Sequence, residues 1–178
     1  MLSYALAHSP ALQRLVRGRR VVELGAGAHG AAGLAAAFVC DCDVVVTDKP
    51  AALAALRANV VANQGRLLGR CSAEALDWGC SLQESALWGT AEAIVAADVL
   101  WTPEVAEAFG RAAVAAARAP KRDVAVLVCH EVRPASARAM EALRQVAGIA
   151  GLDKLDATHY HPEWRAPGEI EILQLRLA

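Results

Sequence analysis

Apolar runs of four to seven residues alternate with longer stretches of helical periodicity along the chain. Uninterrupted apolar runs predict strands buried on both faces of a sheet. The predicted strands are residues 21–24, 44–47, 93–97 and 124–129, with a weaker one over residues 70–76. Helices are predicted over residues 2–16, 31–40, 51–63, 103–118 and 134–147, and Pro10 is expected to divide the first of them.

The last part of the chain has a different pattern. Residues 154–160 and 170–177 read as two strands with no helix between them, and the second alternates apolar and polar positions. This arrangement predicts an antiparallel hairpin at the edge of an otherwise parallel sheet. The fold class is therefore α/β, with a Rossmann-like sheet covered by helices on both faces. Ligands of such sheets bind beyond the carboxyl ends of the strands, so the residues that follow each strand are the candidates for a site.

The first strand runs into a glycine-rich turn, "VVELGAGAHGAAG" over residues 21–33. Gly25, Gly27 and Gly30 have the G-x-G-x-x-G spacing of dinucleotide-binding turns. The segment from Glu23 to Gly27 instead resembles the first motif of S-adenosylmethionine-dependent methyltransferases. Both patterns indicate a nucleotide-type cofactor at a strand–helix junction, and this turn alone leaves the two cofactors open.

Acidic and aromatic residues follow the other strands. Asp48 ends the second strand, where a carboxylate can accept hydrogen bonds from ribose hydroxyls, although it also suits the cap of the next helix. Asp77 and Trp78 follow the third strand. Trp78 could stack on an adenine and Asp77 could accept from its amino group, while plain packing is the alternative for Trp78.

Asp98 and Trp101 follow the fourth strand and suit methyl transfer to an amine. A lysine amine must be neutral to attack, but its reference pKa is about 10.4. An apolar, aromatic-walled channel disfavours the charged form. A nearby carboxylate can still orient the nitrogen, and positioning supplies most of the catalysis in such a reaction.

Five segments in order resemble the seven-β-strand protein-lysine methyltransferases, a group that includes the methyltransferase-like 21 enzymes and the calmodulin-lysine methyltransferase. They are "RRVVELGAG", "VVVTDKPAALAALRANVVANQ", "ALDWG", "IVAADVLW" and "HYHPEWRAPGEIEILQLR". The resemblance covers nearly the whole chain and implies the class I methyltransferase fold with strand order 3-2-1-4-5-7-6. It also implies S-adenosyl-L-methionine as cofactor and a lysine of a folded protein, often a chaperone or translation factor, as acceptor.

The resemblance assigns roles residue by residue. The residues implied in cofactor binding are Glu23, Gly25, Gly27, Asp48, Asp77, Trp78 and Ala97. Asp98 and Trp101 match the family's D-x-x-(Y/F/W) element and are implied as the catalytic residues that line the lysine channel. Arg133 matches a basic residue often found after the fifth strand.

The chain departs from the family pattern in three places. The glycine turn is one residue longer around His29, so that Gly30 marks the far side of an extension. Relatives carry an upstream segment with a cofactor-covering Trp, which makes the chain N-terminally short by comparison. Residues 66–85 align poorly around "LDWG".

Composition and charge exclude several classes of function. The 178 residues suffice for a single domain, here expected to span 1–178, and the net charge of −1 gives no case for nucleic acid or an anionic membrane as partner. The five scattered cysteines predict neither a disulfide framework nor a metal site, and the pairs His130–Glu131 and His159/His161 lack a third ligand. With no signal peptide or membrane span in the sequence, a cytoplasmic or nuclear monomer is expected.

Three alternatives to a protein-lysine methyltransferase stay open from the sequence. The acceptor could be the amine of a small molecule. The fold could serve as a non-catalytic interaction module, which the altered glycine turn favours. A nicotinamide-dependent oxidoreductase rests only on the glycine spacing, and no Tyr-Lys or His-Asp pair supports it.

Overall fold

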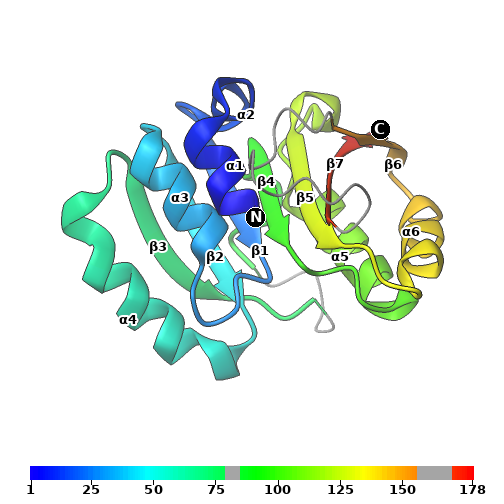
Figure 1. Cartoon of the computed structure of the whole chain (residues 1–178), viewed down its shortest axis with the longest axis horizontal. Helices are drawn as coiled ribbons and strands as arrows, with labels where there is room; N and C mark the ends of the chain where they lie inside the picture. Colours follow the sequence, from blue (N-terminus) through cyan, green and yellow to red (C-terminus); the bar gives the residue numbers. More distant parts are fainter. Residues whose placement is uncertain (79–84, 156–169) are drawn as a thin grey trace.

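A seven-stranded sheet in the order β3-β2-β1-β4-β5-β7-β6 forms the centre of the protein (Figure 1). The structure is a computed structural model that describes residues 1–78, 85–155 and 170–178. The strands are β1 Arg20–Leu24, β2 Asp43–Asp48, β3 Arg70–Ala75, β4 Ala93–Ala97, β5 Ala125–Glu131, β6 Ile149–Lys154 and β7 Ile170–Leu177. The first five are parallel, and β7 runs antiparallel to both β5 and β6. The predicted strand order and the C-terminal antiparallel pair are confirmed.

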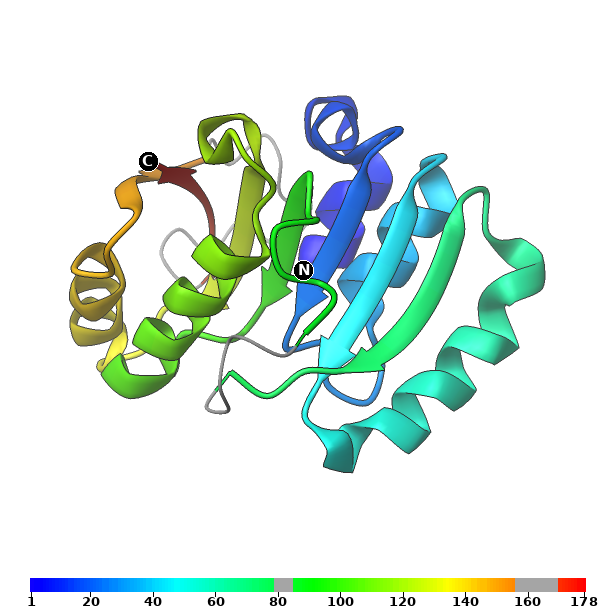
Figure 2. The ribbon, with the colours of Figure 1, turned by 180° about the vertical axis from the view of Figure 1, so that it is seen from behind.

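Helices cover both faces of the sheet (Figures 1 and 2). They are α1 Leu2–His8, α2 Pro10–Val16, α3 Ala31–Val39, α4 Leu53–Asn63, α5 Pro103–Ala116 and α6 Ser136–Arg144, with short 3-10 turns η1 Pro50–Ala52, η2 Gln64–Arg66 and η3 Lys121–Asp123. Neighbouring residues of one strand face different cores: Val21 packs with α1 to α4, and Val22 packs with α5 and α6. Burial on both faces explains why the central strands read as uninterrupted apolar runs.

Most predicted elements lie within a few residues of their observed bounds. The break expected at Pro10 is real, because Ser9 ends α1 and accepts a hydrogen bond from the Leu12 N–H as the cap of α2. The strand predicted over residues 154–160 is wrong in position. Strand β6 begins at Ile149, directly after Gly148 turns the chain with a φ of +92°. Residues 156–160 lie outside the described part of the chain.

Helix α3 lies so close to β2 that Gly33 has no room for a side chain. A Cβ built on Gly33 would lie 2.5 Å from Val46 Cγ1 and 2.8 Å from Glu23 Oε2. We expect Gly33→Ala to lower the free energy of unfolding by about 1–3 kcal/mol through overpacking. Urea denaturation measures this loss. The control is Gly65→Ala, where an added Cβ meets no atom within 4 Å. An equal loss in both variants would contradict the close packing of α3.

Two properties of the described residues bear on function. None of their helices is both long and apolar enough to cross a bilayer. Within residues 1–78, 85–155 and 170–178, no group of three or more His, Cys, Asp or Glu side chains could hold a metal ion.

Candidate cofactor and acceptor site

The glycine turn after β1 lies at the carboxyl edge of the sheet, at the bottom of Figure 1. Gly25 and Gly27 both have positive φ angles, 74° and 61°, which side-chain-bearing residues rarely adopt. The N–H groups of Gly25 and Ala26 donate to the Thr47 carbonyl at 3.0 and 2.9 Å. A Cβ on Gly27 would meet nothing within 4 Å. Packing therefore does not require glycine at position 27, whereas the backbone conformation does.

Asp48 lies beside this turn and binds it directly. Its Oδ2 accepts a hydrogen bond from the Gly27 N–H at 2.7 Å, and its Oδ1 accepts one from the Lys49 N–H at 2.7 Å. The alternative role as a helix cap is not observed, because the residue that caps η1 is Lys49. The structure thus joins the two residues that the sequence predicted as the ribose and glycine-motif parts of one site.

Glu23 has a different position from the other predicted cofactor residues. Its side chain is 2% exposed and lies against the start of α3, where Oε2 accepts from the Gly33 N–H at 2.8 Å and Oε1 from the Ala32 N–H at 3.4 Å. Burial raises the pKa of Glu23 to about 7, against the lowering effect of these two hydrogen bonds. Glu23 therefore fixes the helix that follows the glycine turn, and its role in cofactor binding stays a prediction.

Trp78 packs over the glycine turn. A Cβ built on Gly25 would lie 2.9 Å from Val99 Cγ1 and 3.0 Å from the Trp78 ring. The indole also meets Phe109 edge-on, with 5.8 Å between ring centroids. Trp78 is half-buried, so packing holds the ring at the turn while part of it stays accessible.

The remaining predicted cofactor residues lie at the same edge of the sheet. Asp77 is half-buried and precedes Trp78. Ala97 is the last residue of β4 and is paired in register with Cys129 of β5. It is half-buried at the strand end, and its backbone contact with the cofactor stays a prediction.

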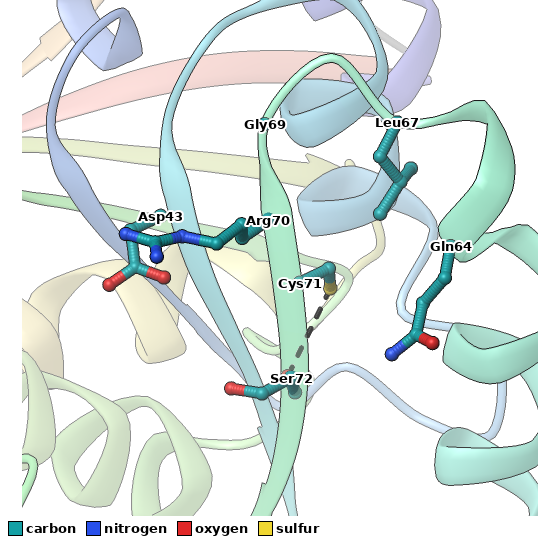
Figure 3. Close-up of a pocket in the computed structure, with 7 residues that line it drawn as sticks. All are labelled: Asp43, Gln64, Leu67, Gly69, Arg70, Cys71 and Ser72. Carbon is teal, nitrogen blue, oxygen red and sulfur yellow. Dashed lines mark hydrogen bonds between the residues drawn. The ribbon is translucent and has the colours of Figure 1, made fainter.

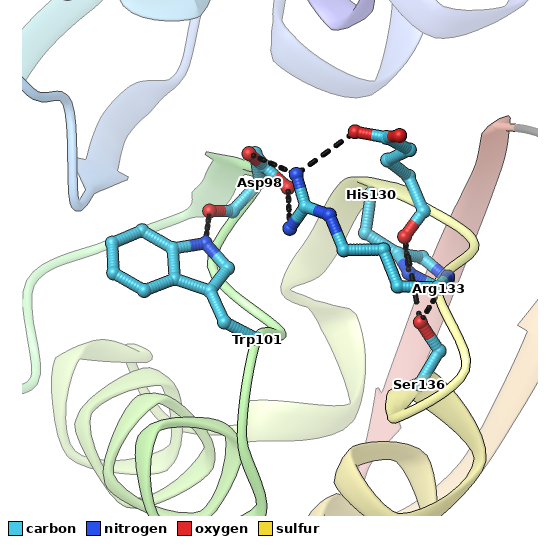
Figure 4. A network of polar contacts seen from close by, with 6 residues as sticks. Asp98, Trp101, His130, Arg133 and Ser136 are labelled. Atoms are coloured by element: carbon cyan, nitrogen blue, oxygen red, sulfur yellow. Dashed lines mark hydrogen bonds and ion pairs between the residues drawn. The ribbon is translucent and has the colours of Figure 1, made fainter.

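Asp98 and Trp101 come together after β4 (Figure 4). Asp98 has a φ of +55°, and the Trp101 indole N–H donates to the Asp98 carbonyl. The Asp98 carboxylate is paired with Arg133, which follows β5: Nη1 lies 3.1 Å from Oδ1, and Nη2 lies 3.1 Å from Oδ2. Trp101 is 55% exposed. The structure therefore presents a carboxylate and an accessible aromatic ring next to each other.

Comparison with known proteins gives the family. The model of the lysine methyltransferase family matches residues 3–145. The chain belongs to the lysine methyltransferase family. The family match, together with an S-adenosylmethionine-dependent methyltransferase among the similar structures, gives S-adenosylmethionine as the cofactor and decides between the two interpretations of the glycine turn. No sequence among the curated proteins matches the chain.

Solved structures share the fold of this chain at low sequence identity. A predicted O-methyltransferase of Agrobacterium tumefaciens superposes with a TM-score of 0.72 at 18% identity, over 100% of this chain and 81% of that one. The S-adenosylmethionine-dependent methyltransferase SibL superposes with a TM-score of 0.67 at 19% identity, over 98% of this chain. TYW2 of P. horikoshii, solved in complex with MeSAdo, superposes with a TM-score of 0.58 at 18% identity, over 93% of this chain. The chain spans 54% of the length of SibL and 59% of that of TYW2.

Three residues that shape the site were not predicted from the sequence. Thr47 is buried, and its hydroxyl donates to the Glu23 carbonyl at 2.7 Å. The Asn59 side chain of α4 donates to the His29 carbonyl and so holds the extended turn, while His29 itself is exposed. Val99 packs at Gly25. Of the three, only Thr47 has a pattern that could have indicated its role, because it is a polar residue inside an apolar strand.

Two further features are a cavity at the opposite edge of the sheet and a buried histidine near the end of β5. A cavity of about 510 Å³ lies at the amino ends of β2 and β3, the opposite edge of the sheet from Gly25 and Asp98 (Figure 3). It is lined by Asp43, Gln64, Leu67, Gly69, Arg70, Cys71 and Ser72. His130 is buried, with Nε2 3.5 Å from Glu171 Oε2. His159 and His161 lie outside the described residues.

Proposed function

We propose that this methyltransferase transfers a methyl group to the side-chain amine of a lysine on a folded protein. The main support is that Asp98 and the exposed Trp101 lie together just after the end of β4 and are joined by a hydrogen bond. Strand β4 is the neighbour of β1, which leads into the glycine turn. The match to a lysine methyltransferase family supports the same acceptor. The segment "ADVLW" also supports the narrower resemblance to the methyltransferase-like 21 and calmodulin-lysine group.

The residues at the carboxyl edge fit S-adenosylmethionine. Gly27 offers an exposed backbone in a conformation that brings a ligand close, and the Asp48 carboxylate beside it suits ribose hydroxyls. The accessible part of Trp78 suits the adenine. When bound, the cofactor supplies a sulfonium methyl group: the amine lone pair forms the new C–N bond as the C–S bond breaks, its electrons stay on sulfur, and the methylated amine leaves as an ammonium ion.

The acceptor side suits a lysine presented from outside. Trp101 is exposed, and its indole is fixed by the hydrogen bond to the Asp98 carbonyl. An aromatic face can pack along the alkyl stem of a lysine and attract its charged end. The neighbouring Asp98 carboxylate can then accept a hydrogen bond from the nitrogen.

Transfer of labelled methyl groups in a lysate of the source organism tests the acceptor class. The purified protein is incubated with lysate and S-adenosylmethionine tritiated on the methyl group, and the products are separated by size. We expect label in protein, released as methyl-lysine on acid hydrolysis. Label confined to small metabolites would favour a small-molecule amine as acceptor. No transfer despite cofactor binding would favour an interaction module.

Asp48 gives a direct test of the cofactor site. Asp48→Asn keeps the shape of the side chain but replaces one acceptor oxygen by a donor, so we expect about tenfold weaker binding of S-adenosylmethionine. Isothermal titration calorimetry measures the affinity. Asp41→Asn is the control, because Asp41 is exposed and precedes β2 at the opposite edge of the sheet. Equal affinity in the Asp48 variant and the control would contradict the ribose role.

A further inference from the structure

Arg133 lies across two acidic side chains at the carboxyl ends of β4 and β5 (Figure 4). Its guanidinium makes a two-pronged pair with Asp98, with both N···O distances at 3.1 Å. Its Nη2 also lies 2.8 Å from Glu131 Oε2. The three groups together carry one net negative charge. The hydrogen bonds and charge of Asp98, followed by those of Glu131, raise the pKa of Arg133, so the guanidinium stays charged.

Backbone and side-chain hydrogen bonds fix both partners of this pair. The Arg133 N–H donates to Ser136 Oγ at 2.8 Å, and that hydroxyl contacts the Glu131 carbonyl at 3.4 Å. The Asp98 N–H donates to the Cys129 carbonyl at 2.7 Å. The two strand ends that bear Asp98 and Arg133 are therefore fixed next to each other by backbone contacts.

The neutralisation of Asp98 matters for an amine acceptor. An unpaired carboxylate next to a lysine stabilises the ammonium form and so raises the pKa of the amine. The ammonium has no lone pair and cannot attack. Without Arg133, Asp98 and Glu131 would present two negative charges to the incoming cation. With Arg133 in place, most of this attraction is cancelled, and the outer lone pairs of Asp98 remain as acceptors.

We propose that Arg133 is a positioning residue that neutralises Asp98, so that Asp98 orients the neutral lysine amine without holding it as ammonium. This inference rests on the proposed lysine acceptor. Two more titratable groups belong to the surroundings of this pair: the Cys129 thiol, on which the charge of Asp98 acts, and the buried His130, whose Nδ1 lies 3.2 Å from the Glu131 carbonyl. Burial raises the pKa of Cys129 to about 11, which keeps this thiol neutral at working pH.

Binding of n-butylammonium, a lysine side-chain analogue, tests the charge balance without cofactor or turnover. The shift of the Trp101 indole N–H signal in a ¹⁵N NMR spectrum reports binding, and a Trp101→Phe variant assigns that signal. At constant ionic strength we expect Arg133→Leu to bind the cation about two- to fivefold more tightly than wild type. In a double variant that also carries Asp98→Asn, most of this increase in cation affinity should disappear.

Two control variants separate charge from structure. Arg133→Lys keeps the charge and should bind the cation within about twofold of wild type. Arg111→Leu removes another exposed arginine that pairs with a carboxylate, Glu107 of α5, and should leave binding unchanged. Unchanged or weaker binding in an Arg133→Leu variant with a folded NMR spectrum would overturn the inference.

The pH dependence of methyl transfer supplies the second readout. In Arg133→Leu we expect the rise of rate with pH to move upward by about 0.3–0.7 pH units, with recovery at high pH, because the amine holds its proton longer. A structural role alone would lower the rate equally at every pH, and that result would overturn the inference. If the wild type transfers no methyl group to protein, the proposed function fails, while cation binding still decides the role of Arg133.

Discussion

Asp98→Asn is expected to slow methyl transfer by about a hundredfold while the affinity for S-adenosylmethionine stays within about twofold of wild type. Asparagine tolerates the positive φ of position 98, so the backbone and the bond from Trp101 are kept. The carboxamide loses the two-pronged pair with Arg133 and one acceptor oxygen. The acceptor nitrogen is then no longer held in line with the methyl group.

Initial rates with tritiated cofactor and calorimetric affinities separate the two effects. Asp123→Asn is the matched control, since Asp123 is exposed and lies in η3 just before the amino end of β5. The control should keep the wild-type rate. A wild-type rate in Asp98→Asn would mean that the carboxylate takes no part in the reaction, and a parallel loss of cofactor affinity would place Asp98 in the cofactor site instead.

Glu23→Gln is expected to flatten the pH dependence of stability. The pKa of Glu23 rises from 4.5 to about 7 on folding because the carboxyl is buried. The folded chain therefore holds this proton more tightly than the unfolded chain does. The resulting stabilisation is complete below about pH 4.5, declines as the pH rises, and is lost above about pH 7. Between pH 5 and pH 8 the wild type should lose about 2–3 kcal/mol through this group.

Urea denaturation of both proteins at pH 5 and pH 8 measures the difference. Glutamine has no titrating proton, so the loss between the two pH values should be about 2–3 kcal/mol smaller in Glu23→Gln than in wild type. Glu74→Gln, on the exposed side of β3, should show the wild-type loss. The same pH dependence in wild type and Glu23→Gln would show that the buried carboxyl does not titrate in this range.

The fold could be predicted from the sequence wherever burial leaves a strong pattern. Strands β1, β2, β4 and β5 are covered on both faces, so their apolar runs stand out and their predicted bounds hold within two residues. Strand β6 is an edge strand with exposed or half-buried residues throughout, among them Gly151 and Asp153, and this mixed pattern gave the wrong position. The hydrophobic pattern does not predict the position of a strand that pairs with only one neighbour and is not covered on both faces.

The common location of the candidate residues was predictable, but their contacts were not. Parallel strands bring their ends to one edge, so the strand-end residues Asp48 and Asp98 could be placed in advance. Their partners could not. The pair between Asp98 and Arg133 joins residues 35 positions apart, and the direction of the Glu23 carboxylate depends on how closely α3 approaches β2. These contacts come from tertiary packing, which no short-range pattern records.

The packing of Trp78 and Val99 against Gly25 constrains how this protein can change. The three residues come from the ends of three different strands, yet a single added methyl group at position 25 would contact both of the others. Alanine at position 25 would therefore need a smaller residue at position 99 or a shifted indole, besides a backbone conformation that residues with side chains rarely adopt. These positions should vary together across related sequences, and any attempt to reshape the binding site for a bulkier methyl-donor analogue has to treat them as one unit.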